Sequence, residues 1–159
     1  MHPSAADSRI WIDKQNPEVF QALSGVTSAV RAAAAAAGLD RSLVELVNVR
    51  VSQLNGCPFC LNVHTHAAVE AGVTQQRLDV LAGWRRTDLF TPLERAALAL
   101  AELTTELPRE QILDREYALA RQHMSDAQVS VVIWVATTIG AFNRVSIMSR
   151  HPVRARREN

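Results

Sequence analysis

Apolar residues recur at helical spacing through most of the chain, and no stretch shows the sustained alternation of apolar and polar residues typical of a β-strand. Leu43, Val47, Val51 and Leu54, for example, fall on one face of a helix. The pattern therefore predicts an all-α fold. Its helices, about six to seven in number, are expected over residues 17–37, 40–55, 58–72, 74–84, 91–107, 109–123 and 125–148.

Boundary residues support these limits. Asp40 is a good N-cap, and Pro58 suits the first position of a helix, where its missing N–H is not needed. Residues 91–94 and 125–128 have the pattern of capping boxes, in which a hydroxyl and a Glu or Gln side chain satisfy free backbone N–H groups. These residues mark the starts of four predicted helices.

The last predicted helix is apolar nearly all round. Residues such as Val131, Trp134 and Ile139 leave it little polar surface, so it must be covered on several sides. In so small a domain we expect another subunit to supply part of that cover, because a large exposed apolar patch promotes association. The prediction is a homo-oligomer, and the alternative is that this is the central helix of a monomer.

Composition limits the class of protein. The 159 residues are enough for one domain with its own core, and a content of 48% hydrophobic and 5% aromatic residues suits an ordered helical protein. The net charge of +1 gives no reason to expect binding to nucleic acid or to an anionic membrane. We divide the chain into an N-terminal arm (1–16), a helical domain (17–149) and a basic C-terminal tail (150–159), which we expect to be solvated.

The expected location is the cytoplasm. Residues 1–12 contain no apolar core of a secretory signal, and the alanine run at 32–37 is too short to span a bilayer. In the reducing cytosol, a lone Cys-x-x-Cys motif is usually catalytic or metal-binding.

Such a motif is present in Asn55-Gly56-Cys57-Pro58-Phe59-Cys60-Leu61-Asn62-Val63-His64. Cys57 falls at the N-cap of the third predicted helix and Cys60 in its first turn. Free N–H groups and the helix dipole there favour an anion, so we expect a lowered thiol pKa. The two cysteines can also close a disulfide, one attacking and the other resolving, and their positions do not decide which attacks.

His64 lies one turn after Cys60 on the same helix face, and Ala67 and Ala71 continue this stripe, which must face the core. His66 falls on the opposite face and is expected to be exposed. A histidine beside a thiol can take its proton or hold the thiolate as an ion pair. The alternative is a satisfied core histidine with two cysteines that act as small buried hydrophobic residues.

Glu45 shares a stripe with Asn48 and Ser52, opposite the apolar face of the second predicted helix. Such a stripe is usually solvated. If the third helix folds back over it, however, Glu45 becomes a partner that orients His64.

A zinc site is the competing interpretation of these residues. Cys57, Cys60 and His64 are three plausible ligands, but a structural site needs four. Glu45 or His66 would have to complete the set, and no second cysteine pair exists. We therefore expect no metal site.

Together these residues resemble the alkylhydroperoxidase D-like (AhpD-like) branch of the carboxymuconolactone decarboxylase family. That signature is a glutamate, a Cys-x-x-Cys motif twelve residues on, and a histidine four residues after the second cysteine. Glu45, Cys57, Cys60 and His64 match each step. Runs at 50–56, 81–85 and 94–100 also look like this family, and the resemblance is strongest over residues 40–105.

The resemblance implies a helical bundle that assembles into trimers or hexamers and acts as a thiol-dependent peroxidase with no bound cofactor. Cys60 would attack the hydroperoxide, and Cys57, nearer the surface, would resolve the sulfenic acid to a disulfide. Glu45 and His64 would form the proton relay. The reductant would be an external dithiol of the lipoyl or thioredoxin type, carried by a lipoylated protein or a dithiol protein, with a peroxiredoxin as a further partner.

One position departs from the family pattern. Well-studied peroxidase members carry a second histidine just before the second cysteine, where this chain has Phe59. The relay is then shorter, and the activity is expected to be weaker or aimed at another substrate. The decarboxylase branch generally lacks the cysteine pair, so its activity is the less expected one. Two alternatives stay open: a non-enzymatic redox sensor or disulfide-exchange partner, and a relative whose cysteine pair is structural.

Overall fold

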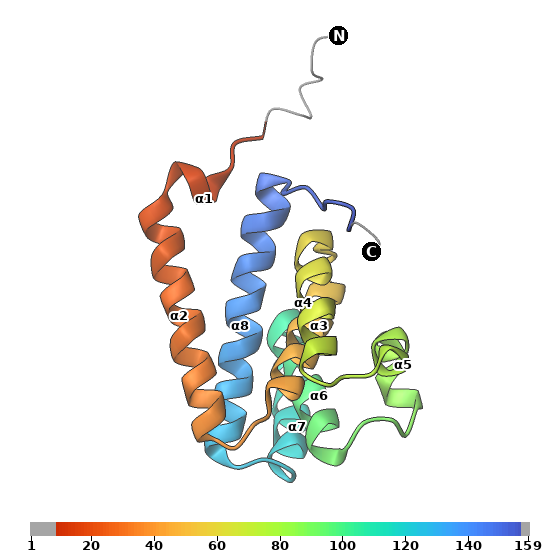
Figure 1. Ribbon diagram of the computed structural model, residues 1–159. Helices are drawn as coiled ribbons and strands as arrows, with labels where there is room; N and C mark the ends of the chain where they lie inside the picture. Colours follow the sequence, from red (N-terminus) through yellow and green to blue (C-terminus); the bar gives the residue numbers. More distant parts are fainter. Residues whose placement is uncertain (1–8, 157–159) are drawn as a thin grey trace.

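The computed structural model describes residues 9–156, which form a bundle of helices without a strand among them (Figure 1). The all-α prediction is confirmed. The elements are α1 (Ile12–Gln15), α2 (Pro17–Ala36), α3 (Arg41–Asn55), α4 (Pro58–Glu70), α5 (Gln75–Asp79), η2 (Leu81–Arg86), α6 (Pro92–Glu106), α7 (Glu110–Arg121) and α8 (Asp126–Ser149).

Both capping boxes form as predicted. At the start of α6, Glu94 N donates to Thr91 Oγ1 at 3.2 Å and Thr91 N donates to the Glu94 carboxylate at 2.8 Å. At the start of α8, Ser125 and Gln128 make the same exchange at 3.2 and 3.0 Å. Gly56 ends α3 in the left-handed conformation, with φ of 65°, which costs glycine little.

Two elements differ from the prediction. The helix expected over residues 74–84 is split into α5 and the 3₁₀ helix η2, and Gly83 within η2 departs from helical geometry with φ −107° and ψ 22°. Helix α1 was not predicted, because a four-residue helix is too short to show a periodic pattern.

Helix α8 lies at the centre of the bundle, with α2 on one side and α3 and α6 on another (Figure 1). Within the described part of the chain, it is the one helix long and apolar enough to cross a membrane, but half of its most apolar stretch is buried within the protein. The central position accounts for much of its apolar character. Trp134 is still 55% exposed, and the homo-oligomer stays a prediction.

Helix α3 holds the functional region in place. It packs against α4, α6 and α8, and nine of its fifteen residues are buried. Its core-facing side chains, Leu43, Val47 and Val51, belong to the same buried cluster as Cys57 and Cys60. The cysteines are therefore set on the most deeply packed part of the bundle.

Candidate active site

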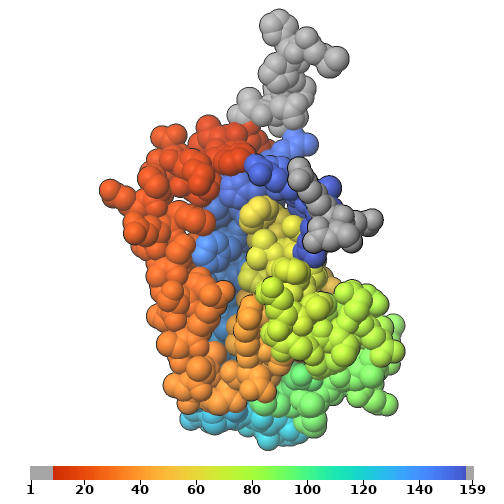
Figure 2. Space-filling view, viewed as in Figure 1, coloured from red at the N-terminus to blue at the C-terminus, as the bar shows by residue number. Residues whose placement is uncertain are grey.

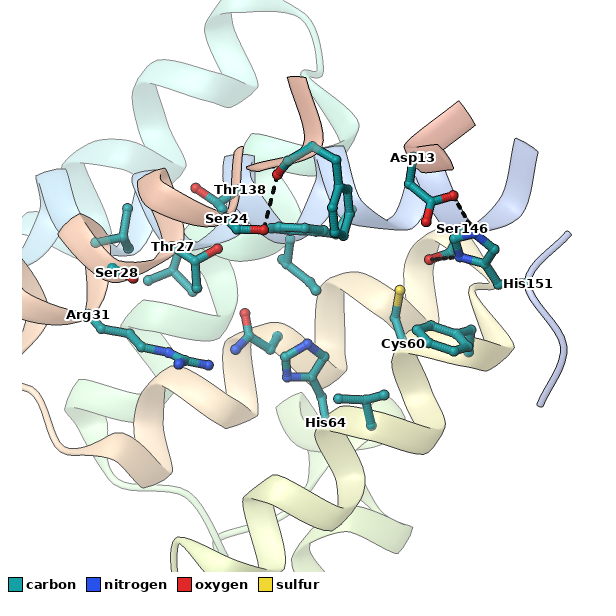
Figure 3. Close-up of a pocket in the computed structure, with 18 of the residues that line it drawn as sticks. Asp13, Ser24, Thr27, Ser28, Arg31, Cys60, His64, Thr138, Ser146 and His151 are labelled. Carbon is teal, nitrogen blue, oxygen red and sulfur yellow. Dashed lines mark hydrogen bonds and ion pairs between the residues drawn. The ribbon is translucent and has the colours of Figure 1, made fainter. Parts of the chain in front are cut away.

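A cavity of about 540 Å³ lies between α2, α4 and α8. Figure 2 shows the groove that leads into it, between α2 (red to orange) and α4 (yellow), with α8 (blue) at its floor. Cys60 and His64 of α4 line this cavity, together with residues of α1 and the C-terminal tail (Figure 3). The cavity gives a small molecule a route to one of the two sulfurs.

Cys57 caps α4, as the sequence predicted. Its Sγ accepts a hydrogen bond from Cys60 N at 3.3 Å, and both cysteines are free thiols. Cys57 is 0% exposed, whereas Cys60 is 4% exposed and lines the cavity. The expectation that Cys57 is nearer the surface is therefore wrong. As the N-cap, its side chain folds back over the first turn of α4 and into the core.

The expected lowering of the thiol pKa is also wrong for Cys60. Burial raises the pKa of Cys60 to about 12, and the hydrogen bond with Cys57 acts in the same direction. Side-chain hydrogen bonds with Asn143 and Ser146 oppose this shift but do not reverse it. At neutral pH the Cys60 side chain is a thiol, so a base must take its proton when it reacts.

The raised pKa predicts a pH dependence that alkylation can test. Because the thiolate is the reactive form, the rate at which iodoacetamide labels Cys60 should rise about tenfold per pH unit between pH 7 and 10. Mass spectrometry of the labelled peptide separates Cys60 from Cys57. A rate that levels off near pH 7 would contradict the raised pKa.

Glu45 and His64 form a pair, because α4 does fold back over α3. The imidazole Nδ1 donates to Glu45 Oε2 at 2.7 Å, and Asn48 Nδ2 donates to the same oxygen at 3.2 Å. Glu45 is only 2% exposed, so its stripe is not solvated at this position. His66 faces outward, 59% exposed, beside Glu70, as its position on the helix predicted.

The carboxylate of Glu45 determines which nitrogen of the His64 imidazole carries the proton. Burial alone would raise the pKa of Glu45, but the hydrogen bond and charge of His64, with smaller contributions from Asn48 and Arg31, bring its pKa below the usual value. A carboxylate that accepts from Nδ1–H leaves Nε2 of the neutral ring as a proton acceptor. His64 lines the cavity, so a base is present on the same wall as Cys60.

A second histidine–carboxylate pair lines the cavity beyond Cys60 (Figure 3). His151 Nε2 donates to Asp13 Oδ1 at 2.9 Å, and the Ser146 hydroxyl lies 3.3 Å from His151 Nδ1. Burial would raise the pKa of Asp13, but its bonds and charge contacts with His151 and Lys14 lower it. Ser146 also acts to lower the pKa of Cys60, which places its hydroxyl between the thiol and His151.

The sequence analysis missed this pair. The expectation of a solvated tail is wrong at His151, whose side chain is only 11% exposed. Its two partners are on α1 and α8, and Asp13 precedes it by 138 residues, so no local pattern connects them. His151 also lies edge-on to Phe59, with ring centroids 5.4 Å apart. An imidazole from the tail therefore contacts the residue that occupies the position of the family's second histidine.

The described residues, 9–156, contain no group of three His, Cys, Asp or Glu side chains placed to hold a metal ion. His64 is bonded to Glu45, and His66 points away from the cysteines. The arrangement is instead suited to thiol chemistry: one sulfur at a cavity, a second sulfur behind it, and two imidazoles whose carboxylate partners fix their orientation.

Comparison with known proteins identifies relatives of this chain. The chain is similar to the uncharacterised protein YdfG of Bacillus subtilis (strain 168), at 38% identity over 109 residues, which are 69% of this chain and 74% of YdfG. It is also similar to alkyl hydroperoxide reductase AhpD of Corynebacterium aurimucosum, at 33% identity over 63 residues, 40% of this chain and 33% of that protein.

A solved structure shares the fold. It is a protein of unknown function from Agrobacterium tumefaciens, provisionally described as an antioxidant defence protein AhpD, with a TM-score of 0.81 and 28% identity over 92% of this chain and 99% of the other. The family model described as "Carboxymuconolactone decarboxylase family" matches residues 17–103, more than half of the chain and the whole Glu45–His64 segment. The chain therefore belongs to the carboxymuconolactone decarboxylase family and has its AhpD-like helical fold.

Proposed function

We propose that this protein is a thiol peroxidase that reduces hydroperoxides through a Cys57–Cys60 dithiol–disulfide cycle. The observation that carries the proposal is that Cys60 lines an open cavity with a carboxylate-oriented imidazole, His64, on the same wall. The likeness to a protein named alkyl hydroperoxide reductase supports the same chemistry.

In the first half of the cycle, His64 Nε2 takes the proton of Cys60 through a water molecule in the cavity. The thiolate attacks the distal oxygen of the hydroperoxide, the O–O bond breaks, and Cys60 becomes a sulfenic acid. The alkoxide that leaves is protonated to the alcohol by the imidazolium of His64. The carboxylate of Glu45 stabilises the positive charge on His64 between these two proton transfers.

In the second half, the Cys57 thiol attacks the sulfenic sulfur of Cys60. An S–S bond forms, and the hydroxyl leaves with the Cys57 proton as water. A dithiol reductant of the lipoyl or thioredoxin type then exchanges with the disulfide and restores both thiols. Because Cys57 is completely buried, this exchange either begins at Cys60 or follows an opening of the first turn of α4. This chemistry fits a reducing compartment such as the cytoplasm.

The test is a steady-state assay of the purified protein with tert-butyl hydroperoxide and dihydrolipoamide. Continuous formation of tert-butanol, many equivalents for each subunit, is the expected result. Oxidation that stops after one equivalent would contradict the enzyme and favour the second candidate, a redox sensor or disulfide-exchange protein. The complete burial of Cys57 is the observation that favours the redox sensor, since it hinders regeneration by an external dithiol.

The Asp13–His151 pair is expected to assist the first half of the cycle through Ser146. His151→Asn should slow oxidation of Cys60 about tenfold, less than is usual for a positioned acid or base, because water in the open cavity can also carry protons. The measurement is the rate of sulfenic acid formation against pH.

The exposed His123 provides the matched control, and His123→Asn should oxidise at the wild-type rate. Ser146→Ala should reproduce the His151→Asn pH profile, because it breaks the same connection while leaving the imidazole on Asp13. Thermal unfolding of each variant separates a loss of fold from a loss of proton transfer. A folded His151→Asn variant with a wild-type profile would contradict this role.

A further inference from the structure

The cavity is much larger than hydrogen peroxide requires. Its volume of about 540 Å³ lies within the range of sites that hold small organic ligands. Much of its wall is apolar and comes from α2 and α8: Phe20, Val30, Val135, Ile139 and Phe142. Such a wall favours an apolar body and contributes little to the binding of a small polar peroxide.

Two hydroxyl groups in this cavity have no partner. Thr27 Oγ1 on α2 and Thr138 Oγ1 on α8 are buried and make no hydrogen bond in the described structure, and Thr138 is only 7% exposed. Ser24, which also lines the cavity, differs because its hydroxyl donates to Phe20 O at 3.0 Å. A buried hydroxyl without a partner costs free energy, and a bound oxygen atom would remove that cost.

A cation lies beside these hydroxyls. Arg31 follows Thr27 by one turn on the same face of α2, lines the cavity, and extends toward His64 in Figure 3. Among the described residues no carboxylate forms an ion pair with Arg31, since Glu45 is bonded to His64 and Asp13 to His151. Its charge is close enough to contribute to the lowered pKa of Glu45.

Two polar residues of α8, Thr138 and Ser146, mark the two ends of the cavity. Thr138 precedes Ser146 by eight residues on α8, which corresponds to about 12 Å along the helix. Ser146 is close enough to Cys60 to act on the pKa of its thiol, whereas Thr138 lies in the part of the cavity nearer Arg31 (Figure 3). The apolar wall lies between these two polar ends.

We propose that the cavity binds an organic hydroperoxide that carries a carboxylate at the end remote from the peroxide group, such as a medium-chain fatty acid hydroperoxide. Arg31, Thr27 and Thr138 bind the carboxylate, the apolar wall covers the alkyl chain, and the peroxide group lies at Cys60. This inference rests on the proposed peroxidase function for its substrate, but the carboxylate site itself does not depend on turnover.

The first experiment measures binding without chemistry. Titration calorimetry on the reduced protein should show that octanoate binds more tightly than octanol. Arg31→Met should weaken octanoate binding about tenfold, since a charge-assisted contact is lost. Arg115→Met, which removes an exposed arginine of α7, is the matched control and should bind octanoate like the wild type. Equal affinity for octanoate and octanol would overturn the inference.

Thr138→Val keeps the shape of the side chain and removes the unpaired hydroxyl. It should weaken octanoate binding without lowering the melting temperature, because the hydroxyl has no partner to lose. A Thr138→Val variant that binds octanoate as well as the wild type would show that this hydroxyl is not part of the site.

The second experiment compares turnover of a medium-chain fatty acid hydroperoxide with that of its methyl ester. The wild type should have the higher kcat/KM for the acid, and Arg31→Met should reduce this preference about tenfold. Turnover of both at equal kcat/KM overturns the carboxylate site and leaves the peroxidase intact. Arg31-dependent binding of octanoate without any turnover supports the site and instead refutes the peroxidase.

Discussion

Cys60→Ser is expected to abolish the reduction of hydroperoxides, lowering turnover by more than about a thousandfold, because a serine hydroxyl is neither oxidised by peroxide nor able to form the disulfide. Of the two sulfurs, that of Cys60 lines the cavity, so no other group on its wall can replace it. The measurement is steady-state formation of tert-butanol with dihydrolipoamide as the reductant.

Comparison with Cys57→Ser shows which of the two cysteines attacks the hydroperoxide and which resolves the sulfenic acid. This variant should still form one equivalent of alcohol for each subunit, and Cys60 should stop at the sulfenic acid, which dimedone traps. Turnover with a dithiol should be lost, because the resolving sulfur is missing. The reverse result, with a single oxidation in Cys60→Ser and none in Cys57→Ser, would exchange the two roles.

His64→Ala is expected to slow oxidation of Cys60 on the order of a hundredfold, the lower end of the range for a positioned acid–base group. The effect should be large because the pKa of Cys60 is raised to about 12, so a thiol without a base rarely ionises near pH 7. The measurement is the single-turnover rate of sulfenic acid formation in the Cys57→Ser background.

His66→Ala, on the outer face of the same helix, is the matched control and should leave this rate unchanged. Added imidazole should partly restore the rate of His64→Ala, since the cavity is open to small molecules. Glu45→Gln should also slow the reaction, because it no longer favours the tautomer that has a free Nε2. Wild-type rates in His64→Ala would exclude His64 as the base.

Much of the fold could be predicted because its signals are local. The apolar spacing in α3 and the capping boxes of α6 and α8 depend on residues within one or two turns, and these elements form where expected. The break between α5 and η2 falls at Val80 and was missed, since the apolar pattern continues through it. The short α1 is held mainly by tertiary contacts, among them the bond from Ile12 N to Ser149 Oγ.

The site could be predicted only in part, for a related reason. The spacing of Cys57, Cys60 and His64 follows from one helix, but the partner of His64 depends on which face of α3 is covered by α4. The pKa of Cys60 is determined by burial, which outweighs the helix start that the sequence shows. His151 and Asp13 come from opposite ends of the chain and meet only in the folded protein.

This meeting of the two ends has a practical consequence. The bond between Asp13 and His151 closes one end of the cavity with segments that lie outside the main helices. Proteolytic removal of the segment that carries Asp13 or His151, or a bulky fusion placed close to either, would therefore remove or displace one wall of the cavity. The untrimmed chain with a cleavable tag is the appropriate material for kinetic work.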